Sequence, residues 1–156
     1  MQFDLIVIGK RMPAWVDSAF NEYSKRLPKN INLNLVEIMP AKRGKNINIE
    51  KLKKIEEENI NESITNNSFV IALDEKGKSK SSRELSVELQ KWIDNQQHIS
   101  IVIGGADGLS PSIKNKANEI WSLSKMTLPH NLVRIIIIEQ IYRAWSIISH
   151  HPYHRE

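Results

Sequence analysis

The chain has 156 residues, of which 40% are hydrophobic and 26% charged, so it can bury a core and is too apolar to be disordered. It contains no cysteine, which excludes a disulfide framework, a thiolate nucleophile and a thiolate metal site, and fits a reducing cytoplasm. Neither a signal peptide nor a membrane span is expected, because apolar runs such as Ile135–Ile138 are far too short.

The formal net charge of +4 leans modestly toward polyanionic partners. Much of the positive charge lies near the N-terminus, at Lys10, Arg11, Lys25, Arg26, Lys29, Lys42, Arg43, Lys45, Lys51, Lys53 and Lys54. Most runs of this kind are simply solvated faces. The loop Lys42–Asn46, which follows Pro40, is the strongest candidate for contacts with phosphate groups.

The first half of the chain alternates between strand and helix patterns. Gln2–Ile8 is rich in β-branched and large apolar residues and predicts a strand that ends at Gly9. Pro13 can open a helix that ends by Pro28, because apolar residues recur between them at helical spacing. A second strand is predicted at Ile31–Ile38, and a long polar helix from Ile49 to Ile64.

The same alternation continues in the second half. Ser68–Leu73 and Ile99–Ile103 are nearly continuous apolar runs, as in strands buried on both faces of a parallel sheet. Between them, Ser81 and Glu84 form a capping-box pattern that starts a helix. The remaining predictions are a short helix at Ser110-Pro111, a short strand at Ile120–Leu123 and an apolar helix from Leu132 to about Ser149.

This order predicts a single α/β domain over residues 1–156, with a mostly parallel sheet and helices on both faces. Rossmann and P-loop glycine motifs are both missing, as are cysteine-rich and HExxH metal patterns. His150–His154 is rich in histidine, but no carboxylate follows at ligand spacing. A structural or substrate-facing tail is therefore favoured over a metal site.

Glycines follow the buried strand Ile99–Ile103. Gly104 and Gly105 come directly after it, and Gly108 follows. Glycine permits positive φ and close approach of a ligand to the backbone, and in open α/β sheets ligands bind at the carboxyl ends of the strands. The glycines predict a ligand site there, while a plain tight turn stays the alternative.

The loop Leu123–His130 mixes small hydroxyl residues with apolar ones, as a pocket for an adenine and a thioether requires. His130 stands where the closing helix begins, and it is either a functional side chain or an ordinary first-turn residue. Further along, Glu139 and Arg143 have the i,i+4 spacing of routine helix support. Arg143 could equally face a substrate phosphate or base.

Several of these segments, taken in order, resemble one family. They are Ile101-Val-Ile-Gly-Gly-Ala-Asp-Gly-Leu109, Leu123-Ser-x-x-Thr127-Leu-Pro-His130, Arg134 to Glu139-Gln-x-Tyr142-Arg143-Ala, and His151-Pro-Tyr-His154. An N-terminal Val-Ile-Gly-Lys-x-Met-Pro-x-Trp pattern and the Lys42–Lys45 loop extend the resemblance over the whole length. Together they are similar to the RlmH family of SPOUT-class enzymes, which methylate N3 of a pseudouridine in large-subunit (23S) ribosomal RNA.

The resemblance implies a C-terminal trefoil knot, a homodimer with the cofactor pocket near the subunit interface, and S-adenosylmethionine as the methyl donor. Carried over by position, the cofactor contacts are Leu73, Gly104, Gly105, Leu123, Ser124, Lys125, Met126, Thr127 and Leu128. Much of this contact would run through the backbone. The candidate catalytic residues are His130 as base or orienter, Arg143 as stabiliser of the charged base, and Tyr153 and His154 as substrate contacts.

A cytoplasmic enzyme without metal or membrane partner is expected, and its small surface predicts that it acts on assembled ribosomes rather than free RNA. The main rival is a non-catalytic ribosome- or RNA-binding factor of the same fold. A SPOUT enzyme acting on transfer RNA is a weaker one, since those usually carry extra RNA-binding domains.

Overall fold

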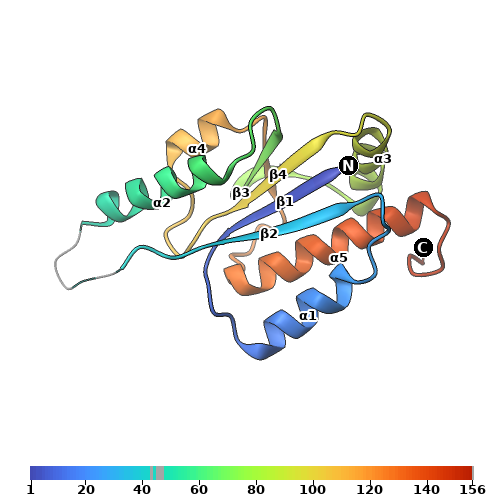
Figure 1. The fold of residues 1–156 in the computed structure, drawn as a ribbon, viewed down its shortest axis with the longest axis horizontal. Coiled ribbons are helices and arrows are strands. Elements are labelled where there is room, and N and C mark those ends of the chain that lie inside the picture. The colour runs from blue at the N-terminus through green and yellow to red at the C-terminus, as the bar shows by residue number, and fades with distance from the viewer. Residues whose placement is uncertain (43, 45–47, 156) are drawn as a thin grey trace.

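The computed structural model describes residues 1–42, 44 and 48–155. Strands and helices alternate along the chain (Figure 1). The elements are β1 (Gln2–Ile8), α1 (Ala14–Ser24), β2 (Asn32–Ile38), α2 (Ile49–Ser63), β3 (Phe69–Ser79), α3 (Ser82–Asp94), β4 (His98–Ile103), α4 (Pro111–Lys116), β5 (Glu119–Ser122) and α5 (His130–Ile148).

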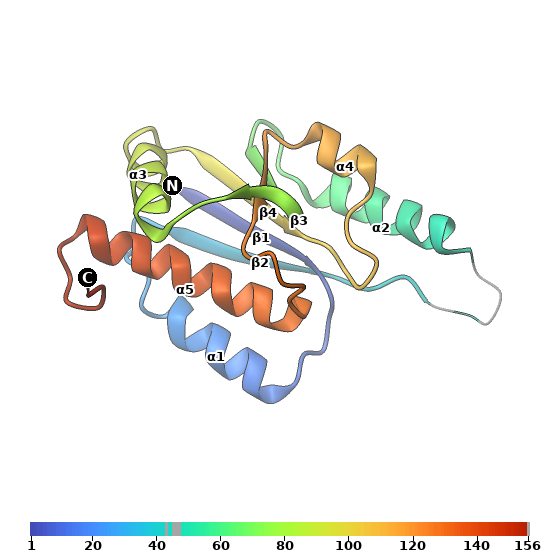
Figure 2. The same cartoon turned by 180° about the vertical axis from the view of Figure 1, so that it is seen from behind.

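The five strands form one sheet in the order β2-β1-β4-β3-β5, and every neighbouring pair is parallel. Helices cover both of its faces, with α1, α3 and α5 on one side and α2 and α4 on the other (Figures 1 and 2). The predicted α/β class, parallel sheet and two helical layers are therefore confirmed.

Alternation along the central strands builds two separate cores. Phe3, Leu5 and Val7 of β1 pack with residues of α1, α3 and α5. Ile6 and Ile8 of the same strand pack with residues of α2 and α4. Since successive side chains of a strand point to opposite faces, a strand buried on both sides is mostly apolar. The exception within β1 is buried Asp4, whose carboxylate accepts hydrogen bonds from Asn34 and Thr65.

Helix ends follow the predicted signals. Ser81 Oγ accepts from the backbone N–H of Glu84 at 3.2 Å, and the Glu84 carboxylate accepts from the backbone N–H of Ser81 at 2.7 Å, so the capping box is confirmed. At α4 the Ser110 side chain accepts from the backbone N–H of Ile113, and Pro111 stands in the first turn. The helix α5 starts at His130, two residues before the predicted position, directly after Pro129.

The prediction that the third strand ends at Leu73 is wrong. The strand β3 continues to Ser79, because after an irregularity Lys78 and Ser79 pair again with Trp121 and Ser122 of β5. At Gly77 the two backbones approach so closely that an added Cβ would lie 2.5 Å from the carbonyl carbon of Trp121. The predicted trefoil knot stays a prediction.

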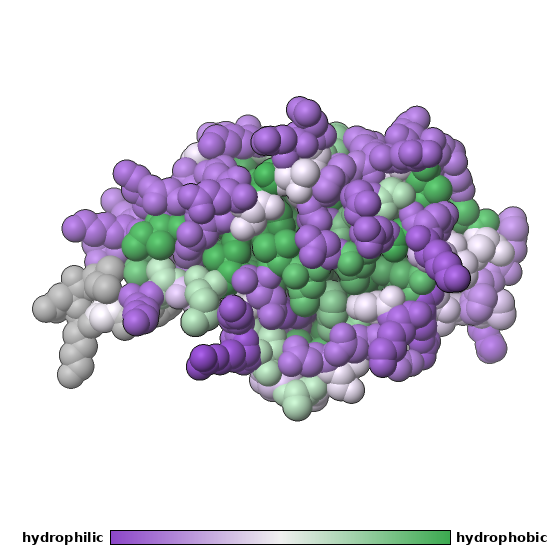
Figure 3. Space-filling model, in the orientation of Figure 1, coloured by the Kyte–Doolittle hydropathy of each residue, from purple (hydrophilic) through white to green (hydrophobic). Residues whose placement is uncertain are grey.

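On the face shown in Figure 3, hydrophilic residues lie along the outer rims and hydrophobic residues form a band across the middle. Among the described residues, no helix is both long and apolar enough to cross a bilayer. The predicted phosphate-binding loop falls partly outside the described residues, since these do not include Arg43, Lys45 and Asn46. Lys42, at its start, is exposed.

Candidate functional site

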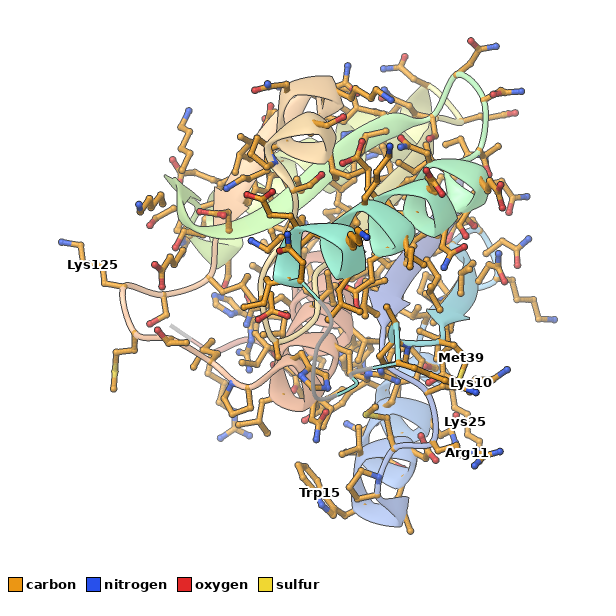
Figure 4. All side chains as sticks on the ribbon, turned by 90° about the vertical axis from the view of Figure 1, so that its left-hand side faces the viewer. Lys10, Arg11, Trp15, Lys25, Met39 and Lys125 are labelled. Atoms are coloured by element: carbon orange, nitrogen blue, oxygen red, sulfur yellow. The ribbon has the colours of Figure 1, made fainter. Side chains whose placement is uncertain are left out.

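A cavity of about 450 Å³ opens at the carboxyl ends of β4 and β5 and beside Leu73–Lys76 in the middle of β3. The structure brings eight of the nine predicted cofactor residues to its wall: Leu73, Gly104, Gly105, Leu123, Ser124, Met126, Thr127 and Leu128. The ninth, Lys125, does not line the cavity, and its side chain points outward (Figure 4). The cavity forms here because parallel strands bring their carboxyl ends, and the loops that follow them, to one edge of the sheet.

The glycines after β4 act by their small size. Neither Gly104 nor Gly105 has a positive φ, so the prediction that glycine is needed there for a left-handed backbone is wrong. A Cβ on Gly104 would lie 2.8 Å from the carbonyl carbon of Gly108, and one on Gly105 would lie 3.0 Å from Ile8 Cγ2. The left-handed residue is Gly108, at φ 72°. The turn folds back on itself, and this shapes the cavity wall.

The cavity also has a charged wall that the sequence did not single out. Asp74 accepts from the backbone N–H of Lys76 at 2.9 Å and from Lys114 Nζ at 3.0 Å. These contacts hold the pKa of Asp74 below its usual value, mainly through the hydrogen bond from the Lys76 backbone and further through Lys114. A polar residue directly after a buried strand was the only available signal for this carboxylate.

His130 lies on the cavity wall, at the first residue of α5. Burial lowers the pKa of its imidazole, and the positive charge of Arg134, one turn further along the helix, lowers it too. Because its pKa lies below the ordinary value of 6.5, the imidazole ring is neutral at neutral pH. A neutral imidazole can accept a proton, as a general base must.

Arg134 is the charged side chain that holds this corner together, a role the sequence did not assign to it. It is 1% exposed. Its guanidinium donates to Glu37 Oε1 at 2.8 Å and to the backbone carbonyl of Gly9 at 3.1 Å. These contacts join the start of α5 to the ends of β1 and β2. The segment that follows β1 is therefore held directly beside His130, whose Cδ2 would lie 3.5 Å from a Cβ on Gly9.

The other three candidate catalytic residues gather at the opposite end of α5. Arg143 Nε donates to Glu139 Oε1 at 2.9 Å, and the Tyr153 hydroxyl donates to the same oxygen at 2.9 Å. The Arg143 guanidinium lies 4.9 Å from the centre of the Tyr153 ring. Burial raises the pKa of the Tyr153 hydroxyl, as do hydrogen bonds with Tyr23 and Glu139, so it remains a proton donor. His154 is half-buried nearby in the tail.

One chain thus separates its candidate catalytic residues into two groups. His130 and Arg143 stand at opposite ends of a helix that rises about 1.5 Å per residue, which places them about 20 Å apart. Within residues 1–42, 44 and 48–155, no three histidine, aspartate or glutamate side chains are grouped as a metal site needs.

Comparison with known proteins identifies the fold family. Residues 1–154 match the family described as "Predicted SPOUT methyltransferase". The chain belongs to the SPOUT methyltransferase family. The family assignment made from the residue pattern is confirmed.

Relatives within this SPOUT family span the same length. The chain is 46% identical to "Ribosomal RNA large subunit methyltransferase H" of Thioalkalivibrio sulfidiphilus over 156 residues, covering 100% of both chains. It is also 46% identical, with the same coverage, to the protein of that name from Hahella chejuensis. A solved structure of a probable methyltransferase from Bordetella pertussis superposes with a TM-score of 0.60 at 14% identity, covering 91% of this chain and 93% of that one, which shows a shared fold.

Proposed function

We propose that this chain uses S-adenosylmethionine to methylate N3 of a pseudouridine in large-subunit ribosomal RNA, in the cytoplasm. The observation that carries the proposal is the cavity at the carboxyl ends of β4 and β5 and the middle of β3, with a neutral His130 on its wall. Full-length relatives named as methyltransferases of large-subunit ribosomal RNA support the substrate.

The cavity wall suits this methyl donor. Its volume of about 450 Å³ lies in the range of small-molecule sites. Leu73, Leu123 and Leu128 offer apolar surface to an adenine, and Gly104 and Gly105 leave backbone groups open to close approach. Asp74, held as a carboxylate by Lys76 and Lys114, offers an acceptor for the donor's ammonium or ribose hydroxyl groups. When bound, the donor would supply a methyl group activated by its sulfonium.

The protein's share of the chemistry is alignment and proton removal. The N3–H of a pseudouridine must lose its proton, because the neutral imide is a poor nucleophile. His130, kept neutral by burial and by Arg134, is placed to accept that proton. Positioning the base in line with the methyl group can lower the barrier by several kcal/mol, on the order of what oriented intramolecular reactions gain.

The remaining candidates act, in this proposal, through a homodimer. Arg143 would stabilise the anionic base, and Tyr153 and His154 would contact the RNA. They lie about 20 Å from His130 in the same chain, so a second protomer must bring its own Arg143 and tail to the cavity. The apolar helix α5, which keeps Leu132 38% exposed, offers a surface for such a partner.

Two measurements test the proposal. Calorimetric titration of the purified protein with S-adenosylmethionine should give saturable heat, whereas the non-catalytic rival predicts none. Mass spectrometry of ribosomal RNA nucleosides, from cells with and without the gene, should show a methylated pseudouridine that disappears with the gene. An unchanged nucleoside profile would overturn the proposed substrate.

A further experiment compares assembled ribosomes with free ribosomal RNA as substrates. A single small domain has little surface with which to select one nucleotide in a large RNA, so we expect methylation of assembled ribosomes to be much faster than that of free ribosomal RNA. Equal initial rates on the two substrates would show that the RNA alone carries the recognition.

A further inference from the structure

Four exposed side chains gather beyond the ends of β1 and β2. Lys10 and Arg11 follow β1, Met39 follows β2, and Trp15 stands in the first turn of α1. We call this set the Trp15 surface. Trp15 and Met39 are each 54% exposed, far more than large apolar side chains usually are. Figure 4 shows Lys10, Arg11 and Met39 on one side of the start of α1 and Trp15 on its other side, all directed outward.

The backbone here is held firmly. The N–H of Gly9 donates to the carbonyl of Ile38 at 2.9 Å, which sets Lys10 beside Met39. The carbonyl of Gly9 is held in turn by buried Arg134. Arg11 takes a left-handed backbone conformation at φ 59°, uncommon for a residue with a side chain. A constrained turn thus presents the two cations.

The Trp15 surface borders the candidate active site. Gly9, the residue before Lys10, lies against the His130 ring, since a Cβ placed on it would be 3.5 Å from His130 Cδ2 and 3.1 Å from Met12 Cε. A polynucleotide that delivers a base to His130 must therefore carry its neighbouring nucleotides across this rim. His130 and Gly104 line the same cavity, so this rim adjoins the cavity wall.

The chemistry of this surface suits a single-stranded nucleic acid. Among the described residues, neither Lys10 nor Arg11 forms an ion pair, and Lys42 adds a further exposed cation after Met39. Unpaired cations neutralise phosphates, while an exposed indole offers a face on which an unstacked base can stack. Proteins that bind single-stranded nucleic acids combine these two features along one groove.

Resting on the proposed function, we infer that the Trp15 surface docks the RNA strand flanking the target nucleotide. Trp15 stacks on an unpaired base next to the target, and Lys10 and Arg11 contact the phosphates on either side of it. Met39, on the same side of α1 as Lys10 and Arg11, adds apolar surface along the path of the strand. The surface therefore holds the substrate in register while His130 faces the reacting N3.

A protein partner fits the same surface less well. Burying Lys10 and Arg11 in a protein interface would require acidic partners, because desolvating unpaired cations is costly. In a symmetric dimer the same chain would have to supply those acids from another part of its surface. RNA supplies the negative charge at every nucleotide. A change in the oligomeric state on mutation is therefore the outcome that would favour a protein partner.

The test measures KM for ribosomes and its salt dependence. We expect Trp15→Ala to raise KM about 10-fold, in the range of single base-stacking contacts, with Trp15→Phe recovering most of the loss. The double variant Lys10→Gln, Arg11→Asn should make the dependence of log KM on log salt shallower by about one for each cation removed. Asparagine is chosen at position 11 because it tolerates the left-handed backbone.

Matched controls lie elsewhere on the surface. Lys29→Gln removes an exposed cation beyond the far end of α1, and Val87→Ala shortens an exposed apolar side chain on α3. Both should leave KM unchanged. Calorimetry with S-adenosylmethionine should give the same affinity for every variant, which shows that the cavity is intact.

The outcomes separate this inference from the proposed function. If the unmodified protein neither binds S-adenosylmethionine nor methylates ribosomes, the proposed function fails. If it does both, while the Trp15 and cation variants keep the original KM and salt slope, docking by this surface is refuted and the function stands. A Trp15→Ala variant with a changed sedimentation coefficient would identify the surface as a protein interface and also refute RNA docking.

Discussion

The guanidinium of Arg134 carries a positive charge into a nearly dry interior, where only a good set of partners makes it tolerable. Glu37 supplies the opposite charge and Gly9 supplies a carbonyl. The same charge faces His130 from one helical turn away and helps to lower the pKa of its ring. One residue therefore both fixes the corner between β1, β2 and α5 and tunes the neighbouring imidazole.

At this residue scale we predict that activity falls on the acid side with a midpoint below 6.5, the ordinary pKa of histidine. His130 must be neutral to accept a proton, and burial together with Arg134 lowers its pKa. Because protonation occurs below the pKa, lowering it extends activity to more acidic pH. Arg134→Lys keeps the charge and should keep the midpoint, whereas Arg134→Gln should raise it.

The measurement is a pH–rate profile with ribosomes at saturation, alongside an NMR titration of the His130 ring. The titration needs no turnover, so it reports on the imidazole even in a variant that is catalytically impaired. A ring that titrates at or above 6.5 in the unmodified protein would contradict the proposed environment. A His130→Ala variant with full activity at every pH would remove His130 from the mechanism.

At the scale of elements, the contact between the ends of β3 and β5 decides the shape of the cavity wall. Gly77 of β3 lies in the irregularity directly before the strands pair a second time, against the backbone of Trp121 on β5. The wall residues Leu73, Asp74 and Leu123 lie on either side of that stretch. Because two backbones meet there without an intervening side chain, the distance between the strands is set by glycine.

We predict that Gly77→Ala destabilises the protein by about 3 kcal/mol, at the upper end of overpacking effects. Its Cβ would meet backbone atoms of Ile120 and Trp121, which cannot turn aside as a side chain can. Gly108→Ala is the contrasting variant, because a Cβ there meets nothing within 4 Å and only the positive φ opposes it. We expect it to cost about 1 kcal/mol.

Urea unfolding of both variants, without ligand, checks this ranking. If Gly108→Ala proved the more damaging, backbone conformation rather than the close contact at Gly77 would dominate this edge. Equal effects would likewise contradict the predicted order.

Elements with a strong local signal could be predicted from sequence. The apolar run at Ile99–Ile103 and the Ser81 capping box gave the strand β4 and the start of α3 because their causes lie within a few residues. The extension of β3 beyond Leu73 could not be predicted, since its residues are mostly polar and its pairing partner lies on β5, more than forty residues later. Pairing over such a distance is a tertiary effect that overrides local pattern.

The candidate site likewise has a part that could be predicted from the sequence and a part that could not. The positions that line the cavity came from a family pattern and a strand-end rule, and eight of nine converge. Neither the burial of Arg134 nor its contact with Gly9 has a sequence signature, because they join segments 125 residues apart. The paired Glu139 and Arg143 were visible as i,i+4 neighbours. The docking of Tyr153 on that pair was not, because it depends on how the tail turns back.

At the scale of the whole molecule, α5 acts as a rod with one group of candidate catalytic residues at each end. It packs between α1 and α3, so neither end can swing toward the other. The separation of His130 from Arg143 and the tail is therefore a fixed property of the protomer. A site that needs both groups has to draw them from two chains.

We predict complementation between two impaired variants. His130→Ala and His154→Ala should each be weakly active alone. After unfolding and refolding together in equal amounts, about a quarter of the sites should combine an intact His130 with an intact tail from the other chain. Methyl transfer to ribosomes measures the recovery, and mixing without refolding is the control. A mixture no more active than its components would show that each site lies within one chain.

The strand order affects how the protein folds during its synthesis. The first strand, β1, pairs on one side with β4, so that Gln2 lies opposite His98, and β3 pairs with β5 later still. Closing contacts over such distances slows folding, because each loop must be ordered before its contacts stabilise it. His130 and Arg134 come after all five strands. A growing chain on the ribosome therefore has no complete cavity until its last helix is made, and the methyl donor can act as a ligand only of the finished protein.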